Sequence, residues 1–149
     1  MMKGHYRNRH VAGQNRLEFA MPEKALPSVF VVDDEPVIAM TLAVILNMSG
    51  FDATGFNDAA AALKAAEAEC PDLLITDVSM PGMNGIELAI RFRSLHPNCK
   101  ILLFSGHTAS GGLLDAAKGR GYHFTILAKP VHPKELLAEI KRIRSEPSF

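Results

Sequence analysis

The sequence has few cysteines and lacks the glycine-rich loops that bind nucleotide phosphates. Its 149 residues include two cysteines, Cys70 and Cys99, which show no C-x-x-C or other metal-ligand spacing. We therefore expect two partly buried free thiols in a reducing compartment, which favours the cytoplasm and argues against a disulfide or a zinc site. No G-x-G-x-x-G follows the first apolar run and no G-x-x-x-x-G-K-[ST] occurs, so a flavodoxin-like nucleotide binder is not indicated.

The sequence also lacks an excess of charge of either sign. Lys plus Arg and Asp plus Glu are equal at 16 each, which argues against a general nucleic-acid-binding surface. The basic segment from Met1 to Ala20 has no apolar core of a signal peptide, no membrane span, and no helical or strand periodicity. Residues 1–27 are therefore expected to be a disordered extension.

What the sequence does contain is enough apolar residues for the core of one domain. Hydrophobic residues make up 48% of the chain, and from residue 28 onward short apolar runs alternate with amphipathic segments. The expected strands span residues 29–32, 51–56, 73–77, 100–105 and 124–128, and the expected helices span 36–48, 58–69, 85–95, 113–119 and a final segment from Pro133. Five β-α units in sequence predict an α/β fold, a doubly wound five-stranded parallel sheet with helices on both faces, formed by residues 28–145 and followed by a short tail, 146–149.

Two of these helices carry more detailed expectations. Asn57 is a suitable N-cap for the helix 58–69, because its side chain can accept a hydrogen bond from a free backbone N–H. The helix 85–95 has apolar residues at helical spacing that are expected to be buried: Ile86, Ala89, Ile90 and Leu95. A glycine-rich turn over residues 106–112 is expected before the helix 113–119.

Four of the five expected strands end in a polar functional group. These groups are Asp33 and Asp34 after the first strand, Asp77 after the third, Ser105 after the fourth and Lys129 after the fifth. Because the carboxyl ends of parallel strands meet at one edge of the sheet, we expect these side chains to lie together. Three converging carboxylates need a cation to stay ionised, and oxygen ligands favour Mg²⁺. A carboxylate, a metal ion, a hydroxyl and an ammonium are the components of a phosphoryl-transfer site.

Four sequence segments at these strand ends together resemble the receiver domains of bacterial two-component response regulators. The segments are Val31-Val-Asp-Asp-Glu-Pro36, Asp77-Val-Ser-Met-Pro-Gly-Met-Asn-Gly85, Leu103-Phe-Ser-Gly106 and Ala128-Lys-Pro130. Each segment alone is a weak signal, but all four in order are a strong one. The resemblance covers about Ser28 to Arg144 and implies the flavodoxin-like, or CheY-like, arrangement of five β-α units.

The resemblance implies a phosphoryl-transfer role for three of these residues. Asp77 would accept a phosphoryl group from the phosphohistidine of a sensor histidine kinase or of a phosphotransfer protein. Lys129 would pair with Asp77 and then with the phosphoryl group, and Ser105 would donate a hydrogen bond to a phosphoryl oxygen. Such a protein is a signalling protein that catalyses only its own phosphorylation and dephosphorylation.

The resemblance also implies a set of Mg²⁺ ligands and one departure from the family pattern. Asp34 and Asp77 would ligate the ion directly, Asp33 largely through water, and Ser79 through its backbone carbonyl. Receivers usually carry an aromatic residue three positions before the lysine, where this chain has Ile126. A small packing shift, in place of the rotation of an aromatic ring, is therefore expected on phosphorylation.

The output implied by the resemblance is a contact with another protein. Few residues follow the last expected helix, so we expect a stand-alone receiver without a DNA-binding domain and without a membrane anchor. The contact surface would be the face formed by the helix 113–119, the strand 124–128 and the last helix, including Leu113 and Tyr122. The same face would support a phosphorylation-dependent homodimer.

Two other functions use similar residues. A haloacid-dehalogenase-type phosphatase has an aspartate nucleophile, Mg²⁺, Ser or Thr and Lys, but its D-x-D pattern is absent from Asp33-Asp34-Glu35-Pro36 and the chain has no room for a cap domain. A pseudo-receiver that serves only as an interaction module stays open, although the intact acidic set disfavours it. Turnover of a soluble phosphomonoester would favour the phosphatase, and stoichiometric labelling of one aspartate would favour the receiver.

Overall fold

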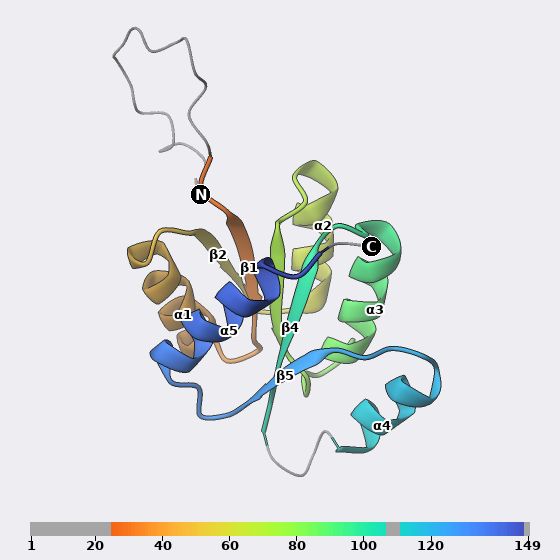
Figure 1. The fold of residues 1–149 in the computed structure, drawn as a ribbon. Helices are drawn as coiled ribbons and strands as arrows, with labels where there is room; N and C mark the ends of the chain where they lie inside the picture. Colours follow the sequence, from red (N-terminus) through yellow and green to blue (C-terminus); the bar gives the residue numbers. More distant parts are fainter. Residues whose placement is uncertain (1–24, 107–110, 148–149) are drawn as a thin grey trace, which may run out of the picture.

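The computed structural model describes residues 25–106 and 111–147 of the chain, in which five strands alternate with five helices (Figure 1). In order, these are β1 (Ser28–Val32), α1 (Pro36–Met48), β2 (Asp52–Phe56), α2 (Ala59–Ala68), β3 (Leu73–Asp77), α3 (Gly85–Leu95), β4 (Lys100–Ser105), α4 (Gly111–Gly119), β5 (Thr125–Ala128) and α5 (Pro133–Arg144). Every strand and helix expected from the sequence is present, and the boundaries differ by at most two residues. The expected disordered extension lies almost wholly outside the described residues.

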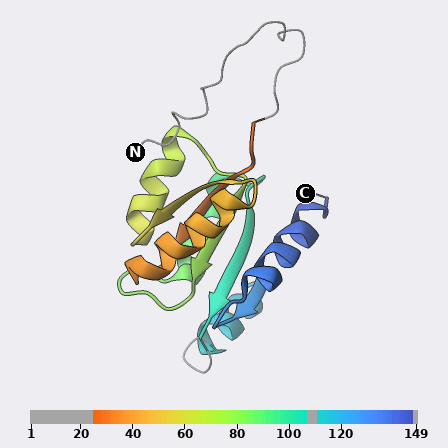
Figure 2. The ribbon, with the colours of Figure 1, turned by 90° about the vertical axis from the view of Figure 1, so that its left-hand side faces the viewer.

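The strands form one parallel sheet in the order β2-β1-β3-β4-β5. Helices α1 and α5 cover one face of the sheet, and α2, α3 and α4 cover the other (Figures 1 and 2). The predicted doubly wound, five-stranded parallel sheet is therefore confirmed. From β1 the chain adds β2 on one side of the sheet, and then β3, β4 and β5 on the other side. Open α/β sheets bind ligands where the strand order reverses in this way, which here is between β1 and β3.

The central strands are apolar because both of their faces are covered by helices. In β1, Val29 and Val31 face α1 and α5, while Phe30 and Val32 face α2 and α3. All five residues of β3 are buried, although the last of them is an aspartate. Strands that are buried on both faces have continuous apolar runs without polar alternation, and this property made them recognisable in the sequence.

The structure corrects the predicted cap of α2. The helix begins at Ala59, so its N-cap is Asp58, whose Oδ1 accepts a hydrogen bond from the Ala61 backbone N–H at 2.8 Å. Asn57 lies one residue too early for this contact. A capping side chain bonds the second or third helical N–H, and only Asp58 has that spacing.

The prediction that Leu95 is buried is also wrong, since 63% of this side chain is exposed. Residues advance by about 100° each along a helix, so Leu95 lies about 180° around α3 from Ile86. Phe92, which is fully buried, continues the apolar stripe in its place.

The helix that follows β4, α4, begins at Gly111, two residues earlier than expected. Two glycines of the expected turn, Gly111 and Gly112, therefore lie in the first turn of the helix. Residues 107–110 of that turn lie outside the described residues.

Candidate functional site

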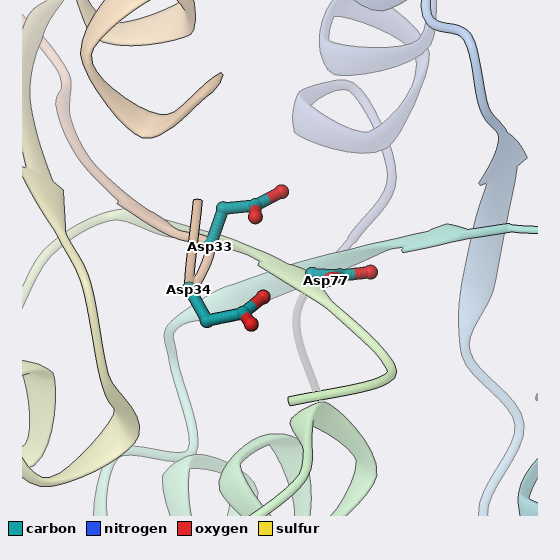
Figure 3. Close-up of side chains that lie close together, drawn as sticks. All are labelled: Asp33, Asp34 and Asp77. Atoms are coloured by element: carbon teal, nitrogen blue, oxygen red, sulfur yellow. The ribbon is translucent and has the colours of Figure 1, made fainter. Parts of the chain in front are cut away.

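Three aspartates converge at the edge of the sheet where the parallel strands end. Asp33 and Asp34 follow β1 directly, and Asp77 is the last residue of the adjacent β3 (Figure 3). One carboxylate oxygen from each lies within 4.8 Å of the others. Asp33 is fully buried and Asp77 is 6% exposed, whereas Asp34 is exposed to solvent. The expectation that these three carboxylates meet is confirmed.

The sheet register explains why the carboxylates meet. Val32 of β1 is the partner of Thr76 in β3, so the next residues along the two strands, Asp33 and Asp77, lie side by side. The turn after β1 is held by the Asp33 Oδ1 atom, which accepts a hydrogen bond from the Glu35 backbone N–H at 2.9 Å. Pro36 then begins α1, where its missing N–H has no intrahelical partner to lose.

Lys129 brings a positive charge to this acidic cluster from the residue that follows β5, the strand two places away from β3 in the sheet. Its Nζ donates to Asp33 Oδ2 at 3.1 Å and lies 3.3 Å from Asp77 Oδ1. The Lys129 backbone N–H donates to the Ser105 carbonyl at 3.0 Å, which fixes the start of the lysine side chain beside the end of β4. The lysine therefore bridges two carboxylates, although the sequence suggested a pairing with Asp77 alone.

Burial and charge shift the pKa values of this cluster. Burial raises the pKa of the Asp77 carboxyl; Lys129 opposes this effect, and the charges of Asp33 and Asp34 reinforce it. For Lys129, burial alone would lower the pKa, but the hydrogen bond to Asp33 and the charge of Asp77 outweigh burial, and the pKa is raised. The ammonium thus stays charged at neutral pH, while Asp77 is harder to ionise than an exposed aspartate.

A glycine makes the close approach of β3 and α3 possible. The Gly85 backbone N–H donates to the Val78 carbonyl at 2.8 Å. A Cβ atom at position 85 would collide with the backbone carbonyl oxygen of Asp77. Only glycine fits here without moving the backbone that carries Asp77. This positioning role of Gly85 was not predicted from the sequence, although an Asn-Gly pair before a helix is a recognisable signal of a tight turn.

The two serines of the expected site lie at its periphery. Ser105 ends β4, between β3 and β5, and its hydroxyl donates to the Gly106 carbonyl at 3.0 Å. Ser79 is exposed two residues after Asp77 and lines an open hollow together with Pro81 and Asn84. The structure thus brings Asp33, Asp34, Asp77 and Lys129 into one cluster and leaves both serines beside it.

Comparison with known proteins identifies the family to which this arrangement belongs. The family model of the response regulator receiver domain matches residues 29–141. The chain is a member of the response regulator receiver family. This family is the receiver domain of response regulators, which take part in two-component signal transduction.

Individual relatives agree with this assignment. The response regulator receiver protein CpdR of Brucella abortus is 31% identical over 115 residues, which cover 77% of this chain and 94% of that protein. The C4-dicarboxylate transport transcriptional regulatory protein DctD of Rhizobium meliloti is 30% identical over 118 residues, 79% of this chain and 25% of that protein. The solved structure of the chemotaxis protein CheY4 of Vibrio cholerae has a TM-score of 0.69 at 30% identity and covers 80% of this receiver and 99% of that chain. This receiver spans between a quarter and a half of the length of the first curated relatives it matches.

Beside the acidic cluster, the receiver has a mainly apolar cavity of about 470 Å³. Its lining comes from the start of α1, the end of β4 and the segment after β5: Val37, Ile38, Thr41, Leu42, Phe104, Gly106, Lys129, Pro130 and Val131. The surface of α1 next to the cavity is also apolar and has no charged residue. The large apolar side chains exposed on α1 are Val37, Met40, Val44 and Met48. No helix in the described part of the receiver is long and apolar enough to cross a membrane.

Proposed function

We propose that this receiver accepts a phosphoryl group on Asp77 from the phosphohistidine of a sensor histidine kinase or of a phosphotransfer protein. The observation that carries the proposal is a nearly buried carboxylate at the ligand-binding edge of the sheet, with an ammonium 3.3 Å away and two further carboxylates beside it. An Asp77 oxygen attacks phosphorus, the O–P bond forms as the P–N bond to the donor imidazole breaks, and the imidazole leaves with the bonding pair. The product is an aspartyl phosphate.

Asp33, Asp34 and Asp77 fit Mg²⁺, because each offers an oxygen and their spacing suits one small cation. The ion would be held directly by Asp34 and Asp77 and by the backbone carbonyl of Ser79. Both oxygens of Asp33 already accept hydrogen bonds, from the Glu35 N–H and from Lys129, which supports a contact through water for this residue. When bound, Mg²⁺ neutralises charge on the transferred group.

Lys129 and Ser105 act on the phosphoryl oxygens in this proposal. The Lys129 ammonium has three N–H donors, and it pairs with two carboxylates, those of Asp33 and Asp77. The ammonium therefore holds Asp77 in place before transfer and then stabilises the new negative charge next to it. Ser105 ends the strand between β3 and β5, from where its hydroxyl can donate to a phosphoryl oxygen once the adjoining loop moves inward.

The phosphodonor must reach Asp77 from the edge of the sheet, beside the apolar cavity. The uncharged exposed surface of α1 adjoins this approach, so we expect a donor whose contact surface is apolar. The output contact is proposed on the face of α4, β5 and α5, where Ile126 is 37% exposed on the edge strand. A partner protein or a second phosphorylated copy would bind there. The compartment consistent with a kinase partner of this kind is the cytoplasm.

Incubation with acetyl phosphate and Mg²⁺ tests the proposal directly. We expect the intact mass of the chain to increase by one phosphoryl group and the label to be lost in Asp77→Asn. Asp72→Asn is the matched control, because it removes an exposed carboxylate just before the same strand and should still be labelled. Labelling that survives in Asp77→Asn would contradict the assignment of the acceptor. Repeated turnover of a soluble phosphomonoester would favour a phosphatase, and a folded chain that takes no label would favour a pseudo-receiver.

A further inference from the structure

Two cysteines that are distant in the sequence meet at the amino end of the sheet, opposite the acidic cluster. Cys70 lies in the connection from α2 to β3, and Cys99 lies in the connection from α3 to β4. The Lys100 backbone N–H donates to the Asp72 carbonyl at 3.0 Å, which holds the two connections together. As a result, the two side chains lie close enough for each thiol to shift the pKa of the other.

The two thiols differ in their access to solvent. Cys70 is exposed, whereas Cys99 is buried and only 5% exposed. Each sulfur also lies near the carbonyl of the next residue, 3.3 Å for Cys70 and 3.4 Å for Cys99. A small oxidant can therefore reach Cys70, while Cys99 is protected from solvent.

We propose that Cys70 and Cys99 form a dithiol oxidation site, which a peroxide converts into an intramolecular disulfide. The Cys70 sulfur attacks the O–O bond of the peroxide, and for hydrogen peroxide the products are a sulfenic acid on Cys70 and water. The Cys99 sulfur then attacks the Cys70 sulfur, the S–O bond breaks, and the hydroxyl group leaves as water with the proton of the Cys99 thiol. In sum, two thiols are oxidised to one disulfide and one hydrogen peroxide is reduced to two waters.

The environment of the pair predicts a slow reaction. Burial raises the pKa of the Cys99 thiol, and it also raises the pKa of Cys70, although the contact with Cys99 acts in the opposite direction on Cys70. Because the thiolate is the reacting species, oxidation needs sustained exposure to peroxide and will not respond to a brief pulse.

The surroundings favour oxidation over metal binding at this pair. The nearest carboxylate, Asp72, is already engaged, because its Oδ2 accepts a hydrogen bond from the Ser28 backbone N–H at 2.7 Å. Among the residues that the structure describes, the only group of three or more possible metal ligands is the acidic cluster at the other end of the sheet. A pair of sulfurs without a third ligand does not complete a structural zinc site.

The disulfide would link the amino ends of β3 and β4 and leave the acidic cluster in place. Asp77 lies at the opposite end of the five-residue strand β3, about 15 Å away at the rise of a β-strand. We therefore expect the oxidised chain to be labelled by acetyl phosphate as well as the reduced chain is. Detection of the disulfide by mass therefore tests the oxidation site independently of the proposed phosphorylation.

Peptide mapping of the full chain after treatment with hydrogen peroxide tests the site. Trypsin places Cys70 in the peptide 65–91 and Cys99 in the peptide 94–100. After alkylation of the remaining thiols, we expect most of the chain to yield these two peptides joined, with a mass lower than their sum by two hydrogen atoms, and to separate on reduction. The chain should stay monomeric on a non-reducing gel.

The exposed position of Cys70 provides a control that should fold normally. In Cys70→Ser, no linked peptide should form, and Cys99 should be alkylated after denaturation at the level of the untreated chain. Three results would overturn the proposal: a sulfinic acid on Cys70 with Cys99 still reduced, a dimer joined through Cys70, or oxidised methionines with no linked peptide.

Discussion

Replacing Asp77 with asparagine should stabilise the metal-free receiver. The carboxylate oxygens lie within 4.8 Å of one another, and two unit charges at that upper limit repel one another by about 3.5 kcal/mol at an effective dielectric constant of about 20. Asp77 experiences this repulsion from both Asp33 and Asp34, while its attraction to Lys129 at 3.3 Å contributes about 5 kcal/mol. The balance is unfavourable by about 2 kcal/mol before the cost of burial is added. Asp77→Asn removes these charge terms and keeps the size of the side chain.

The assay is thermal and urea unfolding with and without Mg²⁺. In EDTA, we expect the free energy of unfolding of Asp77→Asn to exceed that of wild type by about 2 kcal/mol, which corresponds to a Tm about 5 °C higher. Millimolar Mg²⁺ should stabilise wild type by mass action and stabilise the variant much less. Glu67→Gln is the charge-matched control, because Glu67 is exposed on α2 and its loss should change neither value. The reasoning is refuted if Asp77→Asn unfolds at or below the wild-type temperature in EDTA.

The difference in stability between wild type and Asp77→Asn should depend on pH, and the direction of that dependence follows from the pKa of Asp77. The pKa of Asp77 is raised in the folded state, chiefly by burial, so the folded chain binds this proton more tightly than the unfolded chain. Wild type therefore loses stability relative to Asp77→Asn as the pH rises from the ordinary aspartate pKa through the raised one. Below the ordinary value, where the carboxyl is protonated in both states, the two proteins should differ little.

Three further substitutions test the supports of the site and the fold. Lys129→Met leaves the fully buried Asp33 carboxylate without its ammonium and should lower the free energy of unfolding by about 3 kcal/mol in urea, with partial recovery in Mg²⁺. Gly85→Ala forces the β3 to α3 turn apart and should lower the free energy of unfolding by about 2 kcal/mol while weakening acetyl phosphate labelling. Asp58→Ala should lower the free energy of unfolding by about 1 kcal/mol, because it removes the cap of α2, whereas Asn57→Ala should have little effect.

The fold and the acidic part of the site were predictable because both depend on simple rules. Apolar runs of strand length separated by helical segments define a parallel sheet, and the residue after each run must then lie at one edge of the sheet. Asp33 and Asp77 became neighbours by this rule alone, once β1 and β3 paired. The rule needs only the ends of strands, which the charged residues made easy to locate.

Contacts between side chains from different connections could not be predicted in the same way. The second partner of Lys129, Asp33, depends on the path of a flexible side chain across two strands. The meeting of Cys70 and Cys99 depends on the register of β3 and β4, which pairs Leu73 with Lys100. Their sequence spacing carried no such signal, since neither lies within a short motif. The cap of α2 was missed by one residue, because both Asn57 and Asp58 are good capping residues.

β3 shows how the fold tolerates a carboxylate in an unfavourable place. The three apolar residues of the strand, Leu73, Leu74 and Ile75, are fully or almost fully buried, and each buried apolar side chain contributes about 1.5 to 3 kcal/mol to folding. Their combined contribution exceeds the charge repulsion at Asp77, which is about 2 kcal/mol. The strand can therefore hold this carboxylate against its neighbours. A cation that relieves the repulsion would bind with the help of energy already present in the folded chain, so binding at the site and stability of the sheet are coupled.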